Sequence, residues 1–462
     1  MNSRIMVLKF GGSSVAEPKH WRTIAERLQL HLGKGNCPIL VLSALKNVSN
    51  RLEELLHLAI KGQHDEAIKH LKKQHLNFGQ QLNLNLEQGL QPWFNQLEAD
   101  CLSIYHKKQI NPSTHARVLA VGELLSTTIG AEYLRQQGFD LLWQDARKLL
   151  RSTTQQDQWH HYTSAECQYE YDVQMIEKLY GSKQPNNQLV VTQGFIASDS
   201  KGNTVLLGRE GSDTSAAYFA AMVGAKKIEI WTDVTGVFSA NPRDIETAKP
   251  LPYLSYCQSY LMAKFGAKVL HPRVLKPVKE NNIIVNVRST GHVAHSGTVI
   301  SSQNIEQPQS EPKAIAIVTE TKVDRIIFSG SKAKEQCKQI ASRLNLLGFD
   351  ILFDGHRNDE YYVIVKYVNA NMAVSNQRDL KTSFPNESLN IYYQGALVTL
   401  VAETNHGCWN HSLQGWINNQ EDGRVVDYFH KNEGSTYILF VASSDCLPVS
   451  RSLHRKFIEK TN

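Results

Sequence analysis

The sequence predicts an α/β protein in which a domain with a mainly parallel sheet precedes a smaller domain of two similar modules. Continuous apolar runs at 4–10, 37–45 and 189–197 are typical of strands buried on both faces. Between the first two runs, residues 18–33 have apolar side chains at helical spacing, and a glycine ends the pattern. Strand, helix and strand in this order predict a right-handed βαβ unit, from which parallel sheets are built.

Further elements extend this sheet. Apolar runs predict strands at 204–208, 227–234 and 282–289, and helical patterns cover 115–137 and 212–224. Residues 50–110 differ, because they are polar, rich in Leu and Gln, and helical in spacing without a strand pattern. We therefore expect a helical insertion on the side of the α/β core.

The composition of residues 301–313 marks a boundary, since Ser, Gln and Pro dominate and almost nothing is apolar. We predict a linker here, with the first domain covering 1–300. Two βαββ modules follow, at 314–385 and 386–462, which indicates an internal repeat. Strands are expected at 314–320, 323–330, 349–355, 361–368, 390–403, 424–431 and 435–443, and helices at 332–347, 409–419 and from 447 onward.

The totals argue against several classes of protein. A chain of 462 residues with 41% hydrophobic and 20% charged residues is long enough for two or more domains with ordinary cores. Its net charge of +6 comes without a Lys/Arg block, so we expect no nucleic-acid partner, and its longest apolar runs are of strand length, so we expect no membrane span. The seven cysteines form no C-x-x-C pair, which argues against a zinc or redox site and for a cytoplasmic location.

Three glycine-containing loops follow predicted strands, which is where ligands bind in open α/β sheets. The first, "KFGGSS" (9–14), carries a lysine, two glycines and two hydroxyls. Paired glycines turn successive N–H groups toward an anion, and Lys9 adds a point charge. A tight turn with a solvated lysine is the alternative interpretation.

The second loop, "GREGSDT", begins at Gly208 and leads into an alanine-rich helix. Gly208 and Gly211 let the chain bend, and we expect Ser212 or Asp213 to cap the helix. A cap does not account for Arg209, which is placed to face an anion at the positive end of the helix. We predict a carboxylate or phosphate clamp.

The third loop, "WTDVTGVF" (231–238), ends a strand in Thr-Asp, and "NPR" (241–243) follows. This pattern suits hydrogen bonds to a base or ribose, with Arg243 over phosphates. Lys268, in "FGAKVLHP", is a further candidate for phosphate neutralisation. The sequence motifs of P-loop enzymes and protein kinases do not occur. The pair His160–His161 lacks matching ligands, which favours a solvated loop over a metal site.

Six blocks of the sequence occur in the order and approximate spacing of the aspartate kinases: "KFGGSSV", "VLSALKNVSN", "GELLST", "GREGSDTSAA", "WTDVTGVFSANPR" and "FGAKVLHP". The chain thus resembles this family of the amino acid kinase superfamily over essentially its whole length. The resemblance implies a three-layer αβα kinase fold followed by tandem ACT domains. It also implies ATP-dependent phosphorylation of the L-aspartate side chain to 4-phospho-L-aspartate, the first step toward lysine, threonine and methionine.

The resemblance also implies roles at matched positions. Lys9 is assigned to the transferring phosphoryl group, and Asp213 to the orientation of Lys9 and of the waters on Mg²⁺, which ATP carries. Substrate contacts are implied for Ser43, Ser49, Glu123, Arg209 and Ser212. Glu123 would bind the ammonium group and Arg209 the α-carboxylate, although an ordinary surface acid is the alternative for Glu123. ATP contacts are implied for Lys9, Gly11, Gly12, Thr232, Asp233, Phe238, Arg243, Lys268 and Val269.

Regulation and assembly follow from the same resemblance. ACT modules imply an amino-acid effector, lysine or threonine, and a homodimer or dimer of dimers. Here "SGSKAKEQCKQI" (329–340) stands where the family's Gly-Phe-Leu turn is usual. Glu210 stands where glycine is usual, and Phe238 and Asn241 replace a common tyrosine and aspartate. We expect the Glu210 side chain to turn to solvent or to pair with a cation.

Two other functions stay open at this point. A kinase for another amino-acid carboxylate, such as glutamate or acetylglutamate, is disfavoured by the tandem modules and by "GELLST". A catalytically silent amino-acid sensor on the same fold is favoured by Glu210, which adds bulk and negative charge beside the predicted clamp.

Overall fold

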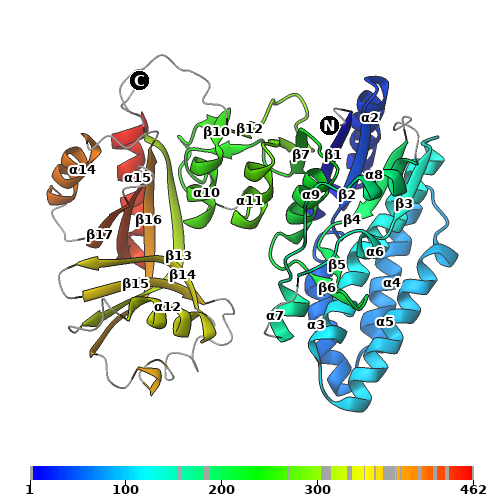
Figure 1. Cartoon of the computed structure of the whole chain (residues 1–462), viewed down its shortest axis with the longest axis horizontal. Helices are drawn as coiled ribbons and strands as arrows, with labels where there is room; N and C mark the ends of the chain where they lie inside the picture. Colours follow the sequence, from blue (N-terminus) through cyan, green and yellow to red (C-terminus); the bar gives the residue numbers. More distant parts are fainter. Residues whose placement is uncertain are drawn as a thin grey trace. The chain divides into compact units, whose positions relative to one another are not determined.

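The computed structural model describes residues 4–153, 158–181, 188–267, 270–302, 314–329, 336–347, 349–357, 360–367, 380, 382–384, 388–402, 408–419, 424–431 and 436–459. The chain forms two compact units (Figure 1). The first comprises Met1–Val237, Pro250–Tyr256 and Leu270–Asn304, and the second comprises Phe238–Lys249, Cys257–Val269 and Ile305–Asn462. Residues 303–313 of the predicted linker lie outside the described ranges.

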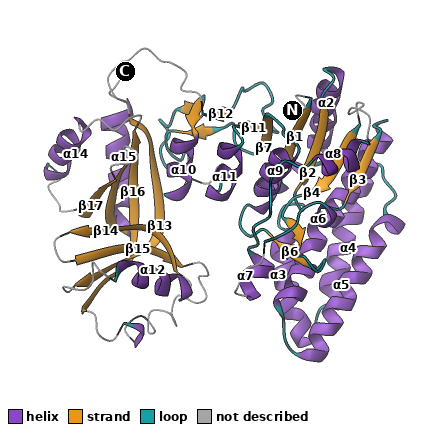
Figure 2. Ribbon diagram, viewed as in Figure 1, coloured by secondary structure: helices purple, strands orange, loops and turns teal. Residues whose placement is uncertain are grey.

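The first unit is built on an eight-stranded sheet with the order β10-β12-β11-β7-β1-β2-β4-β3 (Figure 2). Its strands are β1 (Ile5–Phe10), β2 (Cys37–Leu42), β3 (Leu141–Gln144), β4 (Leu189–Gln193), β7 (Lys227–Thr232), β10 (Tyr253–Ser255), β11 (Ile284–Ser289) and β12 (Thr298–Ser301). Neighbours are parallel except β11 and β12. Every residue of β1, β2 and β4 is buried, which explains their continuous apolar runs. The predicted α/β fold with a mainly parallel sheet is confirmed.

Helices pack on this sheet in two groups. Trp21 of α2 (Pro18–Gly33) meets Tyr133 of α6 (Pro112–Gln136) edge-on, with ring centroids 5.7 Å apart. A Cβ atom on Gly130 of α6 would lie 2.5 Å from the Trp21 ring, so glycine lets the two helices approach. On β1 and β7 packs α9 (Gly211–Met222), which also contacts α11 (Pro272–Glu280) and is buried along its whole length.

The segment predicted as a helical insertion is helical in the structure. It consists of α3 (Val48–Lys61), α4 (Asp65–Gln81) and α5 (Glu87–Lys107), which lie beside α6 in Figure 1. Their leucines and phenylalanines face one another, as Leu52, Leu55 and Phe94 are fully buried. The periodic apolar face therefore determines the packing of this segment, although His75 and Asp100 are buried with it.

The second unit contains a six-stranded antiparallel sheet with the order β14-β15-β13-β16-β18-β17. Its strands are β13 (Ala314–Ser329), β14 (Phe349–Arg357), β15 (Glu360–Tyr367), β16 (Ser388–Ala402), β17 (Val425–Lys431) and β18 (Thr436–Ala442). The two halves of this sheet have the same strand order. Counted outward from the central pair, β13 is followed by β15 and β14, and β16 is followed by β18 and β17, as expected for a repeat. One core forms against α12 (Cys337–Leu346), and another against α14 (Cys408–Asn418) and α15 (Cys446–His454).

Some predicted elements differ in the structure. Residues 314–329 form one strand rather than two, because Lys322 has a left-handed backbone (φ 60°) and forms a bulge that continues the ladder. The run 189–197 splits into β4 and β5 (Ile196–Ser198), since Phe195 is also left-handed. The predicted run at 204–208 yields β6 (Thr204–Leu206), which pairs antiparallel with β5 rather than joining the main sheet.

Several short elements have no counterpart in the prediction. They are α1 (Gly12–Val15), α7 (Gln158–Thr163), α8 (Val173–Tyr180), α10 (Tyr256–Lys264), α11, β3, β8 (Val237–Phe238), β9 (Pro250–Leu251), β10 and β12. Their lengths are too small for a periodic pattern to stand out. Helix α7 carries His160 and His161, so the expected solvated loop is wrong, and His161 Nε2 lies 3.4 Å from Asp199 Oδ2.

Candidate active site

Lys9 lies at the end of the central strand β1 and is buried, with 8% of its surface exposed. Its Nζ atom lies 2.6 Å from Asp213 Oδ1 in the first turn of α9. Strand β1 pairs with β2 and β7 on its two sides, which places Lys9 between Val41 and Ile230. The alternative of a solvated lysine is therefore wrong. A buried ammonium group at a strand end is suited to an anionic ligand.

The loop after β1 turns close to its neighbours. The Gly11 N–H donates to the Trp231 carbonyl at 3.1 Å, and a Cβ atom on Gly12 would lie 2.9 Å from the Ala44 carbonyl oxygen. Only a glycine fits at position 12 without a shift of the backbone. Ser14 Oγ donates to the Trp231 carbonyl at 3.3 Å, so the loop is tied to the end of β7.

The second loop differs from the prediction at the helix start. Glu210, rather than Ser212 or Asp213, is the N-cap of α9, and no side chain caps the helix. The helix begins earlier because Gly208 adopts a left-handed backbone (φ 74°) and its carbonyl accepts from Gly211 N–H at 3.0 Å. Asp213 thereby falls in the first turn, where a carboxylate interacts favourably with the helix dipole.

Glu210 also differs from the prediction in its surroundings. Its backbone is left-handed (φ 51°), its side chain is half-buried, and its Oε2 atom is buried without a hydrogen-bond partner. Burial raises the pKa of the Glu210 carboxyl and the Asp213 charge adds to this, while Lys9 and Arg209 oppose it. Within the described residues it forms no ion pair. The carboxyl is thus partly withdrawn from solvent and feels the charges of Asp213, Lys9 and Arg209.

Arg209 is exposed and forms no ion pair with any described side chain. Near it lies His271, whose pKa is lowered to about 4 by burial and by the charges of Arg273 and Arg209. The sequence reasoning gave His271 no role, although it stands in the block "FGAKVLHP". Its position directly before Pro272 is a recognisable helix-start signal, and its ring does accept from Arg273 N–H at 3.3 Å.

Glu123 lies inside α6 with 3% of its surface exposed, so the alternative of a surface acid is wrong. Its Oε1 atom accepts from Ala44 N–H at 3.1 Å, and its buried Oε2 atom has no hydrogen-bond partner. Burial raises the pKa of Glu123 to about 8, against the opposing effect of the Ala44 hydrogen bond. A cation that bound here would restore the ionised carboxylate and satisfy the free oxygen.

The predicted serines also belong to the first unit. Ser43 follows β2, and its N–H donates to the Phe10 carbonyl at 3.2 Å, which ties it to the end of β1. Ser49 is half-buried in the first turn of α3. Ser212 is buried, and a Cβ atom added to Gly194 would lie 2.5 Å from the Cβ atom of Ser212. The close approach of α9 to the end of β4 therefore requires that glycine.

The predicted nucleotide contacts fall into three groups. Thr232 and Asp233 end β7 in the first unit, where Thr232 Oγ1 donates to Asp233 Oδ1 at 3.1 Å. Phe238 and Arg243 belong to the second unit. Lys268 and Val269 lie outside the described residues. These roles stay predictions.

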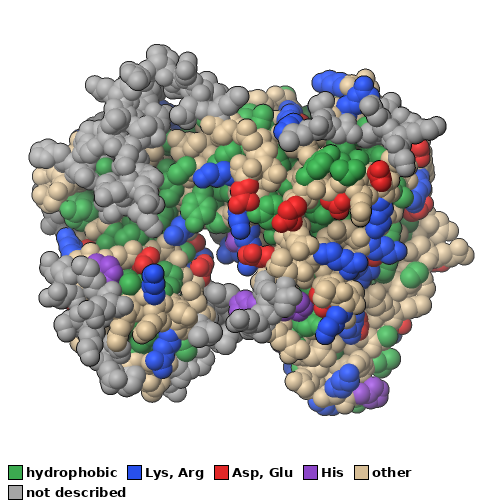
Figure 3. Space-filling model, in the orientation of Figure 1, with side chains coloured by type: hydrophobic (Ala, Val, Ile, Leu, Met, Phe, Trp, Pro, Cys, Tyr) green, Lys and Arg blue, Asp and Glu red, His purple; other side chains and the backbone are tan. Residues whose placement is uncertain are grey.

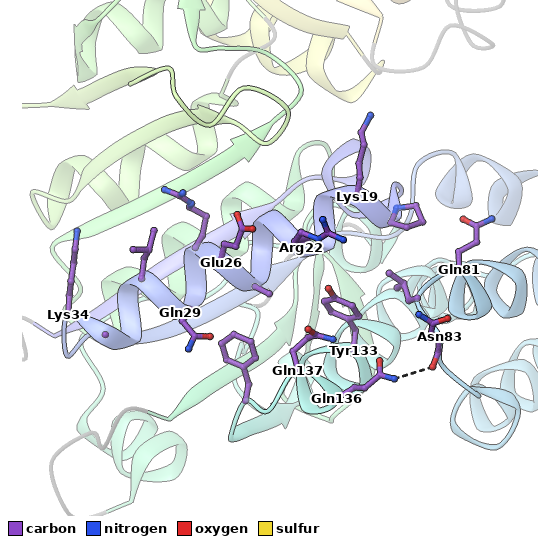
Figure 4. A pocket seen from close by; sticks show the side chains of 17 residues that line it. Lys19, Arg22, Glu26, Gln29, Lys34, Gln81, Asn83, Tyr133, Gln136 and Gln137 are labelled. Carbon is purple, nitrogen blue, oxygen red and sulfur yellow. Dashed lines mark hydrogen bonds between the residues drawn. The ribbon is translucent and has the colours of Figure 1, made fainter.

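A large groove lies elsewhere in the first unit. It has a volume of about 1450 Å³ and is lined by α2, the end of α6 and residues 81–83. Figure 4 shows Lys19 and Arg22 of α2 along it together with Lys34, which follows α2, and with Gln136 and Gln137 at the end of α6 opposite. None of the predicted site residues lines this groove. The groove is therefore separate from the cluster of predicted site residues around Lys9.

The described residues also bear on metal sites and on membrane segments. No three His, Cys, Asp or Glu side chains within the described ranges are placed to share a metal ion. Every helix in these ranges falls short, in length or in apolar character, of what crossing a membrane requires. On the face drawn in Figure 3, Lys and Arg side chains are interspersed with Asp and Glu.

The arrangement in the first unit has a clear chemical capacity. The Lys9 ammonium, the side-chain-free backbone at Gly11 and Gly12, and the positive end of the α9 dipole lie at the ends of β1 and β2. Glu123 provides a buried oxygen without a partner. Such a site suits an anionic group in transfer together with a ligand that carries a cation.

Comparisons with known proteins agree with this geometry. Residues 4–289 match the model of the amino acid kinase family. Lysine-sensitive aspartokinase 3 of Escherichia coli is 30% identical over 312 residues, which cover 66% of each chain. Aspartokinase 1 of Arabidopsis thaliana is 30% identical over 301 residues, covering 64% of this chain and 52% of the relative. Among eight such relatives the match spans from 32% to 66% of the relative's own length.

The fold agrees as well. The crystal structure of E. coli aspartokinase III with aspartate and ADP has a TM-score of 0.80 at 23% identity, covering 97% of this chain and 99% of the other. That of Clostridium acetobutylicum aspartate kinase has a TM-score of 0.73 at 19% identity, covering 98% of this chain and all of the other. With the kinase-type sheet, the buried lysine at its centre and the family match over more than half its length, the chain belongs to the amino acid kinase family.

Proposed function

We propose that this protein is an aspartate kinase, which transfers the γ-phosphoryl group of ATP to the side-chain carboxylate of L-aspartate. The products are 4-phospho-L-aspartate and ADP. The observation that carries the proposal is the buried Lys9–Asp213 pair at the end of β1. The two residues lie in sequence blocks that resemble those of the aspartate kinases, in a chain that is about 30% identical to two aspartokinases over roughly two thirds of its length. The relatives' names and the aspartate and ADP bound to the E. coli enzyme support this choice of substrates.

The acceptor needs no general base. A side-chain carboxylate with a pKa of ~4 is already ionised at neutral pH. The obstacle is electrostatic, because an anion must approach a polyanionic triphosphate. Lys9 would stabilise the charge on the γ-phosphoryl group as its bond to the β-phosphate breaks and its bond to the carboxylate forms. Asp213 would hold Lys9 in place and orient the waters of the Mg²⁺ that ATP carries.

Aspartate would be held at its ammonium group and at its α-carboxylate. The unpartnered Oε2 atom of Glu123 would accept from the ammonium group. Arg209, which is exposed and without an ion pair among the described residues, would bind the α-carboxylate. Ser43, Ser49 and Ser212 would supply hydroxyls. Recognition at both charged groups would select an α-amino acid and leave the side-chain carboxylate for phosphorylation.

The residues fit a nucleotide on steric and electrostatic grounds. Gly11 and Gly12 present backbone without side chains beside Lys9, which leaves room for phosphates. Thr232 and Asp233 would contact the nucleoside from the end of β7, together with the sequence-assigned Phe238, Arg243, Lys268 and Val269. Mg²⁺ would arrive with ATP.

The second unit would carry regulation. The E. coli relative is named lysine-sensitive, and its structure has been solved with lysine and aspartate. We propose lysine or threonine as the effector at the tandem modules, which would serve as ACT domains and pair in a homodimer or a dimer of dimers. Two alternatives compete with the main proposal: a kinase for another amino-acid carboxylate, and a silent sensor, which Glu210 beside the Lys9–Asp213 pair favours.

One assay separates these proposals. The protein is incubated with MgATP, hydroxylamine and either L-aspartate, L-glutamate or N-acetyl-L-glutamate, and the hydroxamate formed by the acyl phosphate is measured. We expect hydroxamate with aspartate, and its inhibition by lysine or threonine. Hydroxamate from another acceptor would reassign the substrate. Nucleotide binding without any hydroxamate would establish the sensor.

A further inference from the structure

Three neighbouring strands of the first unit, β11, β7 and β1, are parallel and end at the same edge of the sheet (Figure 2). The residues that follow them are joined by hydrogen bonds. Thr290 comes directly after β11, and its N–H donates to the Thr232 carbonyl at the end of β7, at 2.9 Å. The backbone at Thr290 is thereby fixed against the middle strand of the three.

A chain of two buried hydroxyl groups leads from Thr290 to the loop after β1. Thr290 Oγ1 lies 2.7 Å from Ser14 Oγ, which lies 3.3 Å from the Trp231 carbonyl oxygen. A carbonyl only accepts and the Ser14 hydroxyl has one hydrogen, so Ser14 donates to Trp231 and accepts from Thr290. Ser14 and Thr290 are 1% and 2% exposed, so water does not compete for either hydroxyl. The direction of both hydrogen bonds is thus determined.

Trp231 is the fixed end of this chain. Its carbonyl oxygen accepts from Gly11 N–H at 3.1 Å as well as from Ser14 Oγ, so both of its lone pairs are engaged by the loop after β1. Its indole ring is fully buried and stacks on the Phe10 ring, with the centroids 5.5 Å apart. The Arg288 guanidinium lies 5.0 Å from the centroid of the same indole. Trp231 is therefore a rigid support for the loop.

The loop that Trp231 supports lies against the Lys9 ammonium group. A Cβ atom on Gly11 would lie 3.3 Å from Lys9 Nζ. Ser14 N–H and Val15 N–H both donate to the Gly11 carbonyl, at 2.9 and 3.1 Å, and so close the loop into a turn. The Ser14 side chain holds the far end of this turn to β7. A displaced turn would therefore change the space beside the ammonium group.

We infer that Ser14 and Thr290 are positioning residues for phosphoryl transfer: through the Trp231 carbonyl they hold the turn at residues 11–14 where it leaves room for the transferring group beside Lys9. This inference rests on the proposed function. Both hydroxyls are closed to solvent and bonded within the protein, so they act through the turn and not on the substrate. Loss of either hydroxyl would leave only a fraction of molecules with the turn in place, and kcat would fall by that fraction.

The first measurement tests the turn itself, in the full-length protein without any ligand. Hydrogen exchange followed by mass spectrometry reports the backbone amides of the peptides that cover the turn. We expect Thr290→Val to speed their exchange by about tenfold, the size of one lost buried hydrogen bond, and Thr290→Ser, which keeps the hydroxyl, to exchange as the wild type does. Thr192→Val is the matched control, because Thr192 of β4 is fully buried and its hydroxyl has no hydrogen-bond partner. Its exchange at the turn should equal that of the wild type.

The second measurement tests the effect on the reaction with the hydroxamate assay. Thr290→Val should lower kcat by about tenfold, with KM for aspartate within about twofold of the wild type, and Thr290→Ser and Thr192→Val should keep kcat. Ser14→Ala interrupts the chain at its centre, so its kcat should be at least as low as that of Thr290→Val. Because both substitutions act through one chain, the double variant should be no slower than Ser14→Ala alone.

The inference is wrong if folded Thr290→Val exchanges at the turn as the wild type does, or if its exchange rises while kcat stays unchanged. It is equally wrong if Thr290→Ser is as impaired as Thr290→Val, because the hydroxyl would then not be the group that acts. A failure of the proposed function is seen separately, since in that case the wild-type protein itself forms no hydroxamate from aspartate.

Discussion

Lys9 Nζ and Asp213 Oδ1 lie 2.6 Å apart, and each side chain is about one-tenth exposed or less. This pair joins the central strand β1 to the first turn of α9, and with it the two glycine loops that the sequence singled out. Its burial predicts separate effects on stability and on activity. Removing one partner leaves the other charge buried and unpaired, whereas removing both leaves two neutral groups of similar shape.

We expect Lys9→Met to lower kcat by at least about 100-fold, because the transferring phosphoryl group loses a preorganised positive charge. Its free energy of unfolding should fall by about 3 kcal/mol or more, since Asp213 is left unpaired. In the double variant Lys9→Met/Asp213→Asn, stability should recover while kcat stays low. Urea unfolding and the hydroxamate assay measure the two effects. Lys19→Met, which removes a largely exposed lysine at the start of α2, is the control. Normal kcat in the double variant would exclude Lys9 from the chemistry.

Glu123 predicts a dependence of stability on pH. Burial holds its pKa at about 8 in the folded protein, whereas an unfolded glutamate titrates near ~4.3. Between these values the folded state binds a proton that the unfolded state has released, so the free energy of unfolding falls as the pH rises through this window. In Glu123→Gln this part of the pH dependence should vanish. Urea unfolding at pH 5.5 and pH 8 compares the two proteins, with Glu132→Gln as a control on the exposed side of α6.

The same carboxyl predicts a proton release on substrate binding. An ammonium group at Glu123 favours the ionised form, so aspartate should displace a proton near pH 7. Calorimetry in two buffers of different ionisation enthalpy detects this release, and Glu123→Gln should abolish it and weaken aspartate binding. If aspartate binds to the wild type without releasing a proton, Glu123 does not contact its ammonium group.

Much of the fold follows from local patterns in the sequence. Strands β1, β2 and β4 are buried on both faces, so they can contain almost only apolar residues, and this pattern is visible without a structure. The bulge at Lys322 is not visible in this way. A polar "TETK" stretch predicts a turn, yet the left-handed Lys322 lets one strand run on beside β16.

The candidate site also has features that the sequence predicts and features that it does not. The glycines and charged residues of each loop stand out in the sequence, and two of them, Lys9 and Asp213, meet in the structure. The burial of Glu123 could not be predicted, because it depends on which face of α6 meets Ala44 and the end of β2. Nor could the link from Thr290 to Ser14, since a single hydrogen bond between distant segments leaves no periodic trace in the sequence.

Glu210 combines a strained backbone with a half-buried carboxyl, and two substitutions separate these features. Glu210→Gly should raise the free energy of unfolding by about 1 kcal/mol, since glycine adopts φ 51° without steric cost. Glu210→Ala keeps the strain but removes the charge. Both should lower KM for aspartate, because a carboxyl beside Lys9 and Arg209 no longer competes with the substrate. An unchanged KM in both variants would mean that the side chain does not face bound aspartate.

Gly12 is predicted to be irreplaceable for a steric reason. In Gly12→Ala the new methyl group would lie 2.9 Å from the backbone oxygen of Ala44, so β1 and β2 must shift at the ends where the phosphates are expected. We expect a loss of about 1–3 kcal/mol in unfolding free energy, as for other overpacked sites, and a higher KM for ATP. In Gly33→Ala, at the end of α2, the methyl group meets nothing within 4 Å, so both quantities should stay near those of the wild type. Equal behaviour of the two variants would contradict this account of the loop.

The fate of the carboxylate oxygen tests the central claim most directly. The protein is incubated with MgATP, hydroxylamine and L-aspartate labelled with ¹⁸O in its side-chain carboxylate, and the inorganic phosphate is analysed by mass spectrometry. Phosphoryl transfer to the carboxylate followed by attack of hydroxylamine on the acyl carbon leaves one labelled oxygen in the phosphate. We predict one ¹⁸O per phosphate released, in amounts equal to the hydroxamate formed. Unlabelled phosphate without hydroxamate would show that ATP is hydrolysed by water and that aspartate is not the acceptor.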